Sequence, residues 1–266
     1  MSRLLVCAPD YYRIAYEINS WMHLEVAADQ QLASVQWHNL MALLEKECGA
    51  VLNPIAPAPE VPDMVFTANA AAMDGRTAVL SRFRFPERQP EEAYFERWFL
   101  EHGYKIEHLP EGLHFEGAGD LLGFDGIKFG GYRQRTDLAA YEHVGRIMDC
   151  EIIAVELVDP RFYHLDTCFC PLAGGELLWF PPAFDHYGQA TISEQVPALR
   201  RIAVPEEEAV RFACNAVSLG RNVVLPDGCP RTTAMLQAHG YTPHAVNLSE
   251  FLKAGGAAKC LTLTLD

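Results

Sequence analysis

The residues best suited to chemistry in this sequence are a cysteine near its end and a histidine–aspartate pair in its middle. Cys260 follows a run of small residues at 255–258, which lets the backbone approach a ligand closely. A thiol becomes an effective nucleophile when a base or a cation favours its thiolate form. His164 is the candidate base, and Asp166 follows it by two residues, which would place both on one face of a strand. Each is more typical of a structural role when alone, but together they predict cysteine-dependent catalysis.

Two of these residues belong to a series of short polar segments that recurs along the chain. The segments precede apolar stretches and are separated by 51, 46, 49 and 45 positions; their central residues are Asn69, Asp120, Asp166, Asn215 and Cys260. A nearly constant interval indicates a repeat architecture in which each copy is one supersecondary unit. If the copies are arranged radially, equivalent positions lie around one axis. The spacing therefore predicts that these side chains meet in a single pocket.

The apolar stretch after each polar segment has the pattern of a β-hairpin. Two apolar runs separated by Asp-Gly, Gly-Gly or another glycine-containing turn are typical of tight hairpins. Four units carry such a turn, at Asp74-Gly75, Asp125-Gly126, Gly174-Gly175 and Gly220-Arg221. The fifth unit has only residues 261–265 before the sequence ends. We therefore expect an N-terminal strand at residues 3–7 to supply the missing partner and close the ring.

A helix and a further strand complete the pattern of each unit. Apolar residues at helical spacing predict helices over residues 91–102, 137–148 and 232–239, and another over residues 32–48. The first and third end at a glycine, which is the expected helix stop. Each unit thus has the order strand, strand, helix, strand, which is an α/β pattern. No linker divides the chain, so we predict one catalytic domain over residues 1–266.

Composition and charge exclude several classes of protein. The chain has 35 acidic and 21 basic residues and a formal net charge of −14, which argues against binding nucleic acid. No apolar stretch approaches the roughly 20 residues that span a bilayer, and the N-terminus lacks the apolar core of a secretion signal. We therefore interpret the eight cysteines as reduced thiols of a cytoplasmic enzyme. Cys168 and Cys170 lack a second pair, which favours one face of a buried strand over structural zinc.

A planar cation is the ligand that this set of side chains suits best. A guanidinium group has five N–H donors and no acceptor, and carboxylates bind its edges in bidentate pairs. Glu116 and Asp120 add two carboxylates to that of Asp166. The central carbon then stays open to attack by Cys260, and His164 could protonate the departing nitrogen and activate water. The sequence predicts hydrolysis of a guanidino compound without a metal or a cofactor.

The same residues carry a resemblance to the guanidine-modifying superfamily. This superfamily includes arginine deiminase, dimethylargininase, succinylarginine dihydrolase and the glycine amidinotransferases. The resemblance covers essentially the whole chain, and its motifs are specific only jointly. The motifs are Phe66-Thr67-Ala68-Asn69, Phe115-Glu116-Gly117-Ala118-Gly119-Asp120, His164-Leu165-Asp166 and the Gly-Gly stretch before Cys260. The resemblance implies a five-bladed α/β propeller of pseudo-fivefold ββαβ repeats around a central active site, in agreement with the recurring polar segments.

The resemblance also implies a role for each candidate residue. Cys260 would be the nucleophile of a covalent S-alkylthiouronium intermediate, and His164 would be the general acid and base. Glu116 would orient His164 or the guanidinium group. Asp120 and Asp166 would hold the guanidinium nitrogens.

Further residues would bind the remainder of the substrate. Arg84 and Arg135 resemble family arginines that hold the substrate carboxylate, and Asn19 could reach the pocket from an N-terminal loop. Asn69 is a departure, because the arginine deiminases have an acidic residue there whereas Thr-Ala-Asn-Ala resembles the dihydrolases. An amide can donate a hydrogen bond to the ureido oxygen of citrulline, which a carboxylate repels. Citrulline could then bind again, and we expect ornithine, carbon dioxide and ammonia as products.

Other activities fit the same residues. A dimethylargininase would release dimethylamine and citrulline, and the length of 266 residues suits that branch. An arginine deiminase would stop at citrulline, while succinylarginine dihydrolases and amidinotransferases are usually longer. A non-catalytic arginine-binding protein would keep the pocket without turnover, although the complete catalytic set argues against it. A metal hydrolase is disfavoured because the ten histidines form no HExxH pair. The sequence is compatible with a homo-oligomer.

Overall fold

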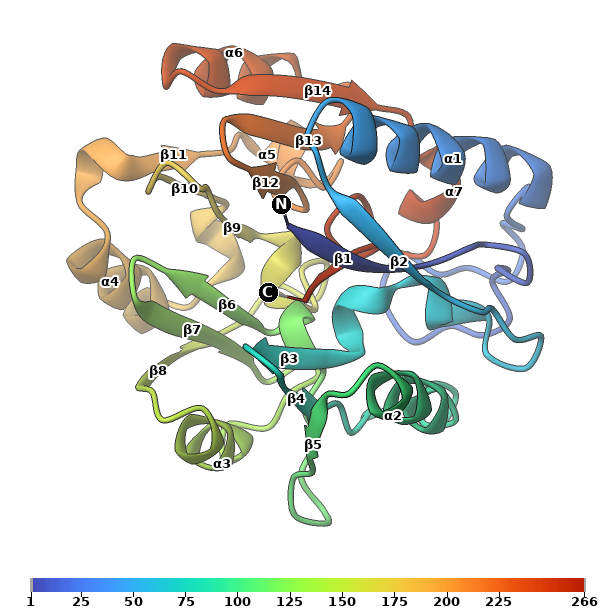
Figure 1. Ribbon diagram of the computed structural model, residues 1–266. Helices are drawn as coiled ribbons and strands as arrows, with labels where there is room; N and C mark the ends of the chain where they lie inside the picture. Colours follow the sequence, from blue (N-terminus) through green and yellow to red (C-terminus); the bar gives the residue numbers. More distant parts are fainter. Residues whose placement is uncertain (1, 266) are drawn as a thin grey trace.

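The structure, a computed structural model, describes residues 2–265. Within these residues the strands form five sheets of three strands, arranged around a common centre with the longer helices outside them (Figure 1). In each sheet the first two strands are antiparallel, and the second and third are parallel across a helical connection. The predicted five-bladed α/β propeller is therefore confirmed. We call each ββαβ unit a blade and number the blades in sequence order.

The elements of the five blades follow one another along the chain. Blades 1 and 2 are β3 (Ala71–Asp74), β4 (Thr77–Leu80), α2 (Glu91–Glu101), β5 (Lys105–Glu107) and β6 (Leu121–Phe124), β7 (Ile127–Tyr132), α3 (Ala140–Ile147), β8 (Ile152–Glu156). Blades 3 and 4 are β9 (Phe169–Pro171), β10 (Leu177–Trp179), α4 (His186–Gln195), β11 (Arg201–Ala203) and β12 (Val217–Leu219), β13 (Asn222–Pro226), α6 (Pro230–Ala238), β14 (Thr242–Val246). Blade 5 is β15 (Leu263–Thr264), β1 (Arg3–Cys7), α1 (Gln30–Lys46), β2 (Val51–Ile55). The short helices α5 (Glu206–Ala209) and α7 (Ser249–Leu252) lie outside this repeat.

Blade 5 closes the ring by combining strands from the two ends of the chain. The antiparallel register of β1 and β15 pairs Leu4 with Thr264 and Leu5 with Leu263. The sequence-based expectation that residues 3–7 complete the last unit is thus confirmed. The four predicted helices are also present, displaced by at most three residues at either end. Helix α4 of blade 3 had no residue range in the prediction.

The polar segments that recur in the sequence are short turns at the inner ends of the blades. Three of them are 3-10 helices, at Thr67–Asn69, Gly117–Gly119 and Leu165–Thr167. Their central residues, which we call the axial belt, are almost completely buried: Asn69, Asp120, Asp166, Asn215 and Cys260. Because Asp166 lies in a 3-10 helix, the expectation that it shares a strand face with His164 is wrong.

Neighbouring blades are joined through this axial belt by hydrogen bonds. Five bonds connect the blades in order around the ring: Asn69 Nδ2 to Glu116 O at 3.3 Å, Leu165 N to Asp120 Oδ1 at 3.0 Å, Asn215 Nδ2 to Asp166 O at 3.1 Å, Cys260 N to Asn215 Oδ1 at 3.1 Å, and Ala68 N to Cys260 O at 3.1 Å. A buried polar group without a partner is costly, so these bonds satisfy the belt and fix the blades relative to one another.

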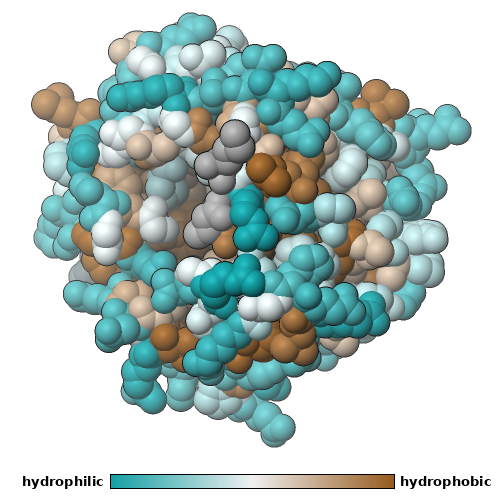
Figure 2. Space-filling view, viewed as in Figure 1, coloured by the Kyte–Doolittle hydropathy of each residue, from teal (hydrophilic) through white to brown (hydrophobic). Residues whose placement is uncertain are grey.

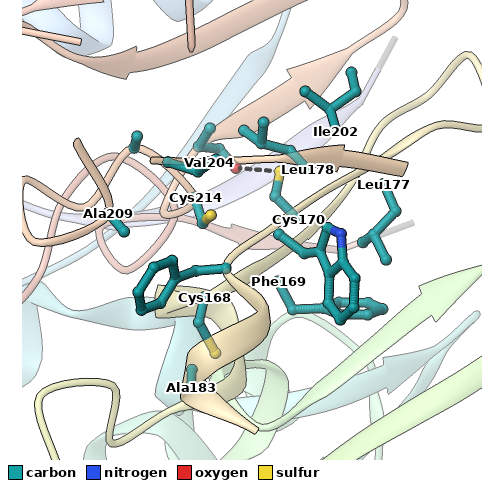
Figure 3. Close-up of a cluster of buried hydrophobic side chains, with 14 of the residues drawn as sticks. Cys168, Phe169, Cys170, Leu177, Leu178, Ala183, Ile202, Val204, Ala209 and Cys214 are labelled. Atoms are coloured by element: carbon teal, nitrogen blue, oxygen red, sulfur yellow. Dashed lines mark hydrogen bonds between the residues drawn. The ribbon is translucent and has the colours of Figure 1, made fainter. Parts of the chain in front are cut away.

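An apolar core lies between blades 2, 3 and 4 and contains four of the cysteines, three of which are labelled in Figure 3. Cys168, Cys170 and Cys214 are buried and free. The expectation that Cys168 and Cys170 share one face of a strand is wrong, because their side chains point in different directions (Figure 3). Cys168 precedes β9 with a ψ of 3°, outside the extended range, so the strand alternation begins only after it. The Cys170 thiol donates to Ala216 O at 3.4 Å.

The face of the molecule seen in Figure 2 is mostly polar. Figure 2 shows hydrophilic and intermediate residues over much of the face seen in Figure 1, with hydrophobic residues in small separate groups. No helix among residues 2–265 is long and apolar enough to cross a membrane.

We expect Gly130→Ala to lower the free energy of unfolding by about 1–3 kcal/mol, the range typical of overpacking. A Cβ at this position on β7 would lie 2.5–2.8 Å from the ring of Tyr141, whose hydroxyl lies 2.9 Å from Asp120 O. Gly123→Ala on the paired strand β6 is the matched control, because its Cβ would meet nothing closer than 4.0 Å. Chemical denaturation measures both variants, and equal stability of the two would contradict the prediction.

Candidate active site

The candidate nucleophile is held at the axis by residues of two other blades. Cys260 is 2% exposed, and its Sγ lies 3.1 Å from Asn215 Nδ2 and 3.5 Å from Asp166 Oδ2. Burial raises the pKa of the Cys260 thiol well above its ordinary value, and the Asp166 carboxylate raises it further. Burial also raises the pKa of Asp166, to about 7. The free site therefore favours a protonated thiol.

Glu116 and His164 form a buried pair next to the axial belt. His164 Nε2 lies 2.7 Å from Glu116 Oε2, which also accepts from Arg135 Nη1 at 2.9 Å. Burial opposes ionisation of Glu116, but the charge of Arg135 and the hydrogen bond from His164 hold its pKa below the ordinary value. Burial lowers the pKa of His164 to about 4, although Glu116 opposes this shift. The pair is thus an ionised carboxylate and a neutral imidazole.

This charge state determines which nitrogen of His164 is available for chemistry. An ionised Glu116 can only accept, so the proton of the neutral ring lies on Nε2. Nδ1 is then an unprotonated acceptor, and it is buried without a hydrogen-bond partner among residues 2–265. A buried nitrogen left in this state is suited to take a proton from a substrate, a thiol or water.

A hollow of about 260 Å³ opens onto Cys260 and contains charges of both signs. Its charged lining residues are Asp63, Arg88 and Arg135. Arg135 is 2% exposed and lies between the rings of Phe85 and Tyr163, at 4.7 and 4.6 Å from their centroids. The remaining lining residues are Ile18, Asn19, Met22, Phe66, Asn69, Tyr163, Ala254 and Cys260.

Asn69 is oriented in this hollow by Arg88. Arg88 Nη1 donates to Asn69 Oδ1 at 2.9 Å, while its Nε and Nη2 bind the two carboxylate oxygens of Glu91 at 2.8 and 2.7 Å. Because the amide oxygen faces an arginine, the Asn69 Nδ2 group is the donor left for other partners. Gly119 is required beside it, since a Cβ there would lie 2.2 Å from Asn69 Nδ2.

Asp63 is the one carboxylate among the described residues that line this hollow. It is 2% exposed, and its Oδ1 has no hydrogen-bond partner among residues 2–265. Burial raises its pKa, while the charge of Arg88 opposes that shift. An unpaired buried carboxylate oxygen is costly without a cation, so the geometry suits an ammonium group of a ligand.

Three of the predicted substrate-binding residues, Arg84, Asp120 and Asp166, are not among the residues that line the hollow. Asp166 instead contacts Cys260 Sγ at 3.5 Å. Arg84 donates to Arg135 O at 2.9 Å and forms an ion pair with Asp137, so its guanidinium group is already occupied. Asp120 accepts from Thr136 Oγ1 at 2.6 Å and from Leu165 N at 3.0 Å, so both of its oxygens serve the fold. The side chains of Arg84 and Asp120 are thus occupied by protein partners, and the structure brings Arg88, and not Arg84, to the hollow.

Asn19 lines the hollow, but its polar atoms are also in use. Its Nδ2 donates to Ala254 O at 3.0 Å, and its Oδ1 accepts from Trp21 N and Met22 N at 2.9 and 3.2 Å. Asn19 therefore fixes the N-terminal loop against the segment that leads to Cys260.

A larger hollow, of about 570 Å³, also touches the axial region. Its lining includes Cys170, Cys214 and Lys259 but no histidine or carboxylate among the described residues. Burial raises the pKa of both thiols, as it does for Cys260, but the described lining of this hollow offers them neither a carboxylate to bind a cation nor a histidine to act as a base. The smaller hollow at Cys260 is therefore the candidate active site.

Comparison with known proteins identifies the family to which this geometry belongs. The family model described as N,N dimethylarginine dimethylhydrolase, eukaryotic, matches residues 15–265. The chain belongs to the dimethylarginine dimethylaminohydrolase family. It is therefore also a member of the guanidine-modifying superfamily, as its motifs indicated.

Two curated relatives of the family have different activities. The chain is 46% identical over 265 residues to the bifunctional arginine dihydrolase/ornithine cyclodeaminase ArgZ of Synechocystis, covering 98% of this chain and 37% of ArgZ. It is 38% identical over 266 residues to N(G),N(G)-dimethylarginine dimethylaminohydrolase of Mycobacterium tuberculosis, covering 99% of this chain and 85% of that protein. The chain thus spans little more than a third of ArgZ.

A solved structure of the family matches the whole chain. The N-terminal domain of ArgZ, from cyanobacteria, was determined as a cysteine-to-serine mutant bound to its substrate. It has a TM-score of 0.96 to this chain at 45% identity, and the match covers 100% of this chain and 98% of that one.

The sequence did not predict Asp63 and Arg88, two charged residues that line the hollow at Cys260. Asp63 stands alone in the apolar run Val61-Pro62-Asp63-Met64-Val65, and a carboxylate in such a run is a sign of a buried charge. Arg88 precedes Glu91 by three residues, a spacing that suggests a surface ion pair rather than a site.

We expect Asp166→Asn to gain stability relative to the wild type as the pH rises. The pKa of Asp166 is about 7 in the folded protein and about 4 when unfolded, so the native state binds more protons between these values. Wild-type stability is therefore lost as the pH rises through this window, and the variant lacks this loss. The difference in free energy of unfolding should grow by a few kcal/mol between about pH 5 and about pH 8.

Chemical denaturation at both pH values measures this difference. The exposed Asp149→Asn is the control, since its backbone φ of 47° is one that asparagine adopts readily. A gap between Asp166→Asn and the wild type that stays constant with pH would show that Asp166 does not titrate as described.

Proposed function

We propose that the chain is a cysteine-dependent hydrolase that converts arginine to ornithine, carbon dioxide and two molecules of ammonia. One observation carries the proposal: a single hollow combines a thiol beside a carboxylate with two buried arginines and an unpaired carboxylate. The first group suits a guanidinium ion, and the second suits an α-amino acid. Arginine is the common compound that carries both.

The relatives support this proposal. ArgZ, 46% identical to this chain, is an arginine dihydrolase in one of its two activities. A mutant of its N-terminal domain that has serine in place of a cysteine has been determined with substrate bound. These facts support arginine as the substrate and a cysteine as the nucleophile.

In this proposal Asp63, Arg88 and Arg135 recognise the amino-acid end of the substrate. Arg135 and Arg88 bind the carboxylate, because arginine side chains match its planar geometry. Asp63 binds the α-ammonium group with the oxygen that lacks a protein partner. Arg84 has no part in this recognition, because its guanidinium group pairs with Asp137.

Binding of the guanidinium ion also activates the nucleophile. The pKa of Cys260 is raised in the free protein by burial and by Asp166. A cation placed between these groups favours both ionised forms, so the thiolate forms when substrate is present. The reactive form then exists mainly in the complex.

The first hydrolysis follows from this arrangement. The thiol proton passes to Nδ1 of His164, the sulfur of Cys260 bonds to the guanidinium carbon, and His164 returns the proton to a terminal nitrogen. The carbon–nitrogen bond breaks and ammonia leaves, which gives an S-alkylthiouronium adduct. His164 then takes a proton from water, the hydroxide adds to the carbon, and the carbon–sulfur bond breaks. The products are citrulline and the restored thiol.

The second hydrolysis repeats these steps on the ureido carbon. Cys260 attacks, a second ammonia leaves, and a thiocarbamate remains on the sulfur. Water releases a carbamate, which decomposes to ornithine and carbon dioxide. Asn69 makes this round accessible, because its Nδ2 group can donate to the ureido oxygen while Arg88 holds the amide in that orientation.

A second candidate function is the hydrolysis of dimethylarginine to citrulline and dimethylamine. The observation that favours it is the 38% identity to the Mycobacterium tuberculosis enzyme, of which the match covers 85%. The two functions share the nucleophile, the base and the amino-acid end of the site. They differ in the leaving group and in the final product.

The proposal extends to the organisation of the protein. We propose that residues 1–266 act as one catalytic domain without a metal or a cofactor. The described cysteines are all free, which suits the reducing environment of the cytoplasm. A homo-oligomer is compatible with this function.

We expect purified protein to release about two ammonia per ornithine from arginine, with little free citrulline at completion. Asn69→Asp keeps the acceptor for Arg88 but removes the amide donor, so it should stop at citrulline with about one ammonia. Mass spectrometry and an ammonia assay measure both. Asn53→Asp, a half-buried position on β2, is the control with the same charge change. Wild-type protein that accumulates citrulline one-for-one with ammonia would rule out the dihydrolase; rapid release of dimethylamine from dimethylarginine would favour the alternative.

We expect Asp63→Asn to raise KM for arginine by about tenfold or more, because a charged hydrogen bond to the α-ammonium group is lost. The matched substrate is 5-guanidinopentanoate, which lacks only the α-amino group, and its KM should not change. Steady-state kinetics on both substrates provides the measurement. An equal rise in the two KM values would mean that Asp63 acts on the fold of the site and not on the amino group.

A further inference from the structure

Asn215 is a fully buried member of the axial belt whose four hydrogen bonds all reach the neighbourhood of the candidate nucleophile. Its Oδ1 accepts from Ala257 N at 2.9 Å and from Cys260 N at 3.1 Å. Its Nδ2 donates to Asp166 O at 3.1 Å and to Cys260 Sγ at 3.1 Å. Two backbone N–H groups require the oxygen on one side, so the amine side necessarily faces the sulfur.

The contacts of the sulfur show why this donor matters. Asp166 lies 3.5 and 3.7 Å from Cys260 Sγ, and its carboxylate opposes a thiolate. The backbone N–H of Ala257 and the charge of Lys259 act in the opposite direction and lower the pKa of Cys260. The amide of Asn215 is a donor, and donors stabilise negative charge on sulfur. The Asn215 side chain therefore holds the Cys260 backbone in place and also donates a hydrogen bond to the Cys260 sulfur.

We propose that Asn215 is a catalytic residue that stabilises the thiolate of Cys260. The inference rests on the proposed function in taking Cys260 as the nucleophile. The amide donates to the sulfur as the thiol loses its proton and again when the carbon–sulfur bond breaks and the sulfur leaves. A donor that is already oriented needs no rearrangement when charge develops. In a dihydrolase the same bond acts in both rounds.

A purely structural role for Asn215 is the competing explanation, since its bonds also join blades 3, 4 and 5. Asn215→Asp separates the two explanations. Its carboxylate has the shape of the amide and can still accept from Ala257 N and Cys260 N, which also favour its ionised form. It cannot donate to the sulfur. Asn53→Asp on β2 adds the same charge away from the belt and serves as the control.

The first measurement is the dependence of kcat/KM on pH, which reports groups of the free enzyme. Asn215→Asp should lower kcat/KM for arginine by about 100-fold, the usual effect of losing one oriented donor. Its acid limb should move upward by about one pH unit or more, because the sulfur loses its donor and faces a carboxylate in its place. The second measurement is the rate at which iodoacetamide alkylates Cys260, located by mass spectrometry, and it should show the same shift.

The outcomes separate the two hypotheses. A loss of activity with unchanged pH profiles for turnover and alkylation would overturn the proposal in favour of a structural role, and unchanged activity would overturn it outright. Arginine turnover that survives in Cys260→Ser would instead overturn the proposed function, while the alkylation profile would still test the bond to the sulfur.

A measurement on the unsubstituted protein covers the case in which Asn215→Asp does not fold. The side-chain amide signals of Asn215 in a ¹⁵N-labelled sample should shift with the same pH midpoint as the ultraviolet absorbance of the Cys260 thiolate. Amide signals that stay fixed while the thiolate forms would contradict a hydrogen bond between the two groups.

Discussion

The hydrogen bonds of the axial belt are the constraint on which the rest of this structure depends. Each blade is a small sheet with its own helix. Four junctions between blades are bonds from a buried side chain to the backbone of a neighbouring blade, and the fifth is a backbone bond between Ala68 and Cys260. The candidate nucleophile, Cys260, takes part in this belt through its backbone N–H and C=O groups. The position of Cys260 is therefore fixed by the same interactions that hold the propeller closed, which joins the stability of the fold to the geometry of the site.

Glu116 and Asp166 are two carboxylates close to the axis that are equally buried but favour opposite charge states. Glu116 stays ionised because the charge of Arg135 and the hydrogen bond from His164 outweigh its burial, whereas the burial of Asp166 outweighs the opposing charge of Lys259 and raises its pKa. The first carboxylate can therefore orient the imidazole in the free protein. The second can become a full counterion only when a cation enters. Such a site is prepared for a positively charged ligand and is inert without one.

The architecture was predictable from the sequence to a greater extent than the site. The ring of five blades could be predicted because it depends on local patterns alone. These patterns are the recurring polar segments, the glycine turns and the unpaired strand at residues 3–7. The substrate-binding set was harder, since Arg84 and Arg88 look equivalent in sequence and are separated only by their partners, Asp137 and Glu91. Asp120 looks like Asp166, but Thr136 and Leu165 occupy its oxygens. A short 3-10 turn also changes the direction of the side chains that follow it. For this reason the prediction that Cys168 and Cys170 share one strand face was wrong.

The closure of blade 5 has a consequence for how the protein is made. Strand β1 is synthesised first but finds its antiparallel partner only when Leu263 and Thr264 have been added. The thiol enters the chain a few residues before that partner. The acidic residues, the imidazole and the arginines of the candidate site all precede its sulfur in the chain. The ring closes, and the candidate site is complete, only after residues 260–264 have been synthesised.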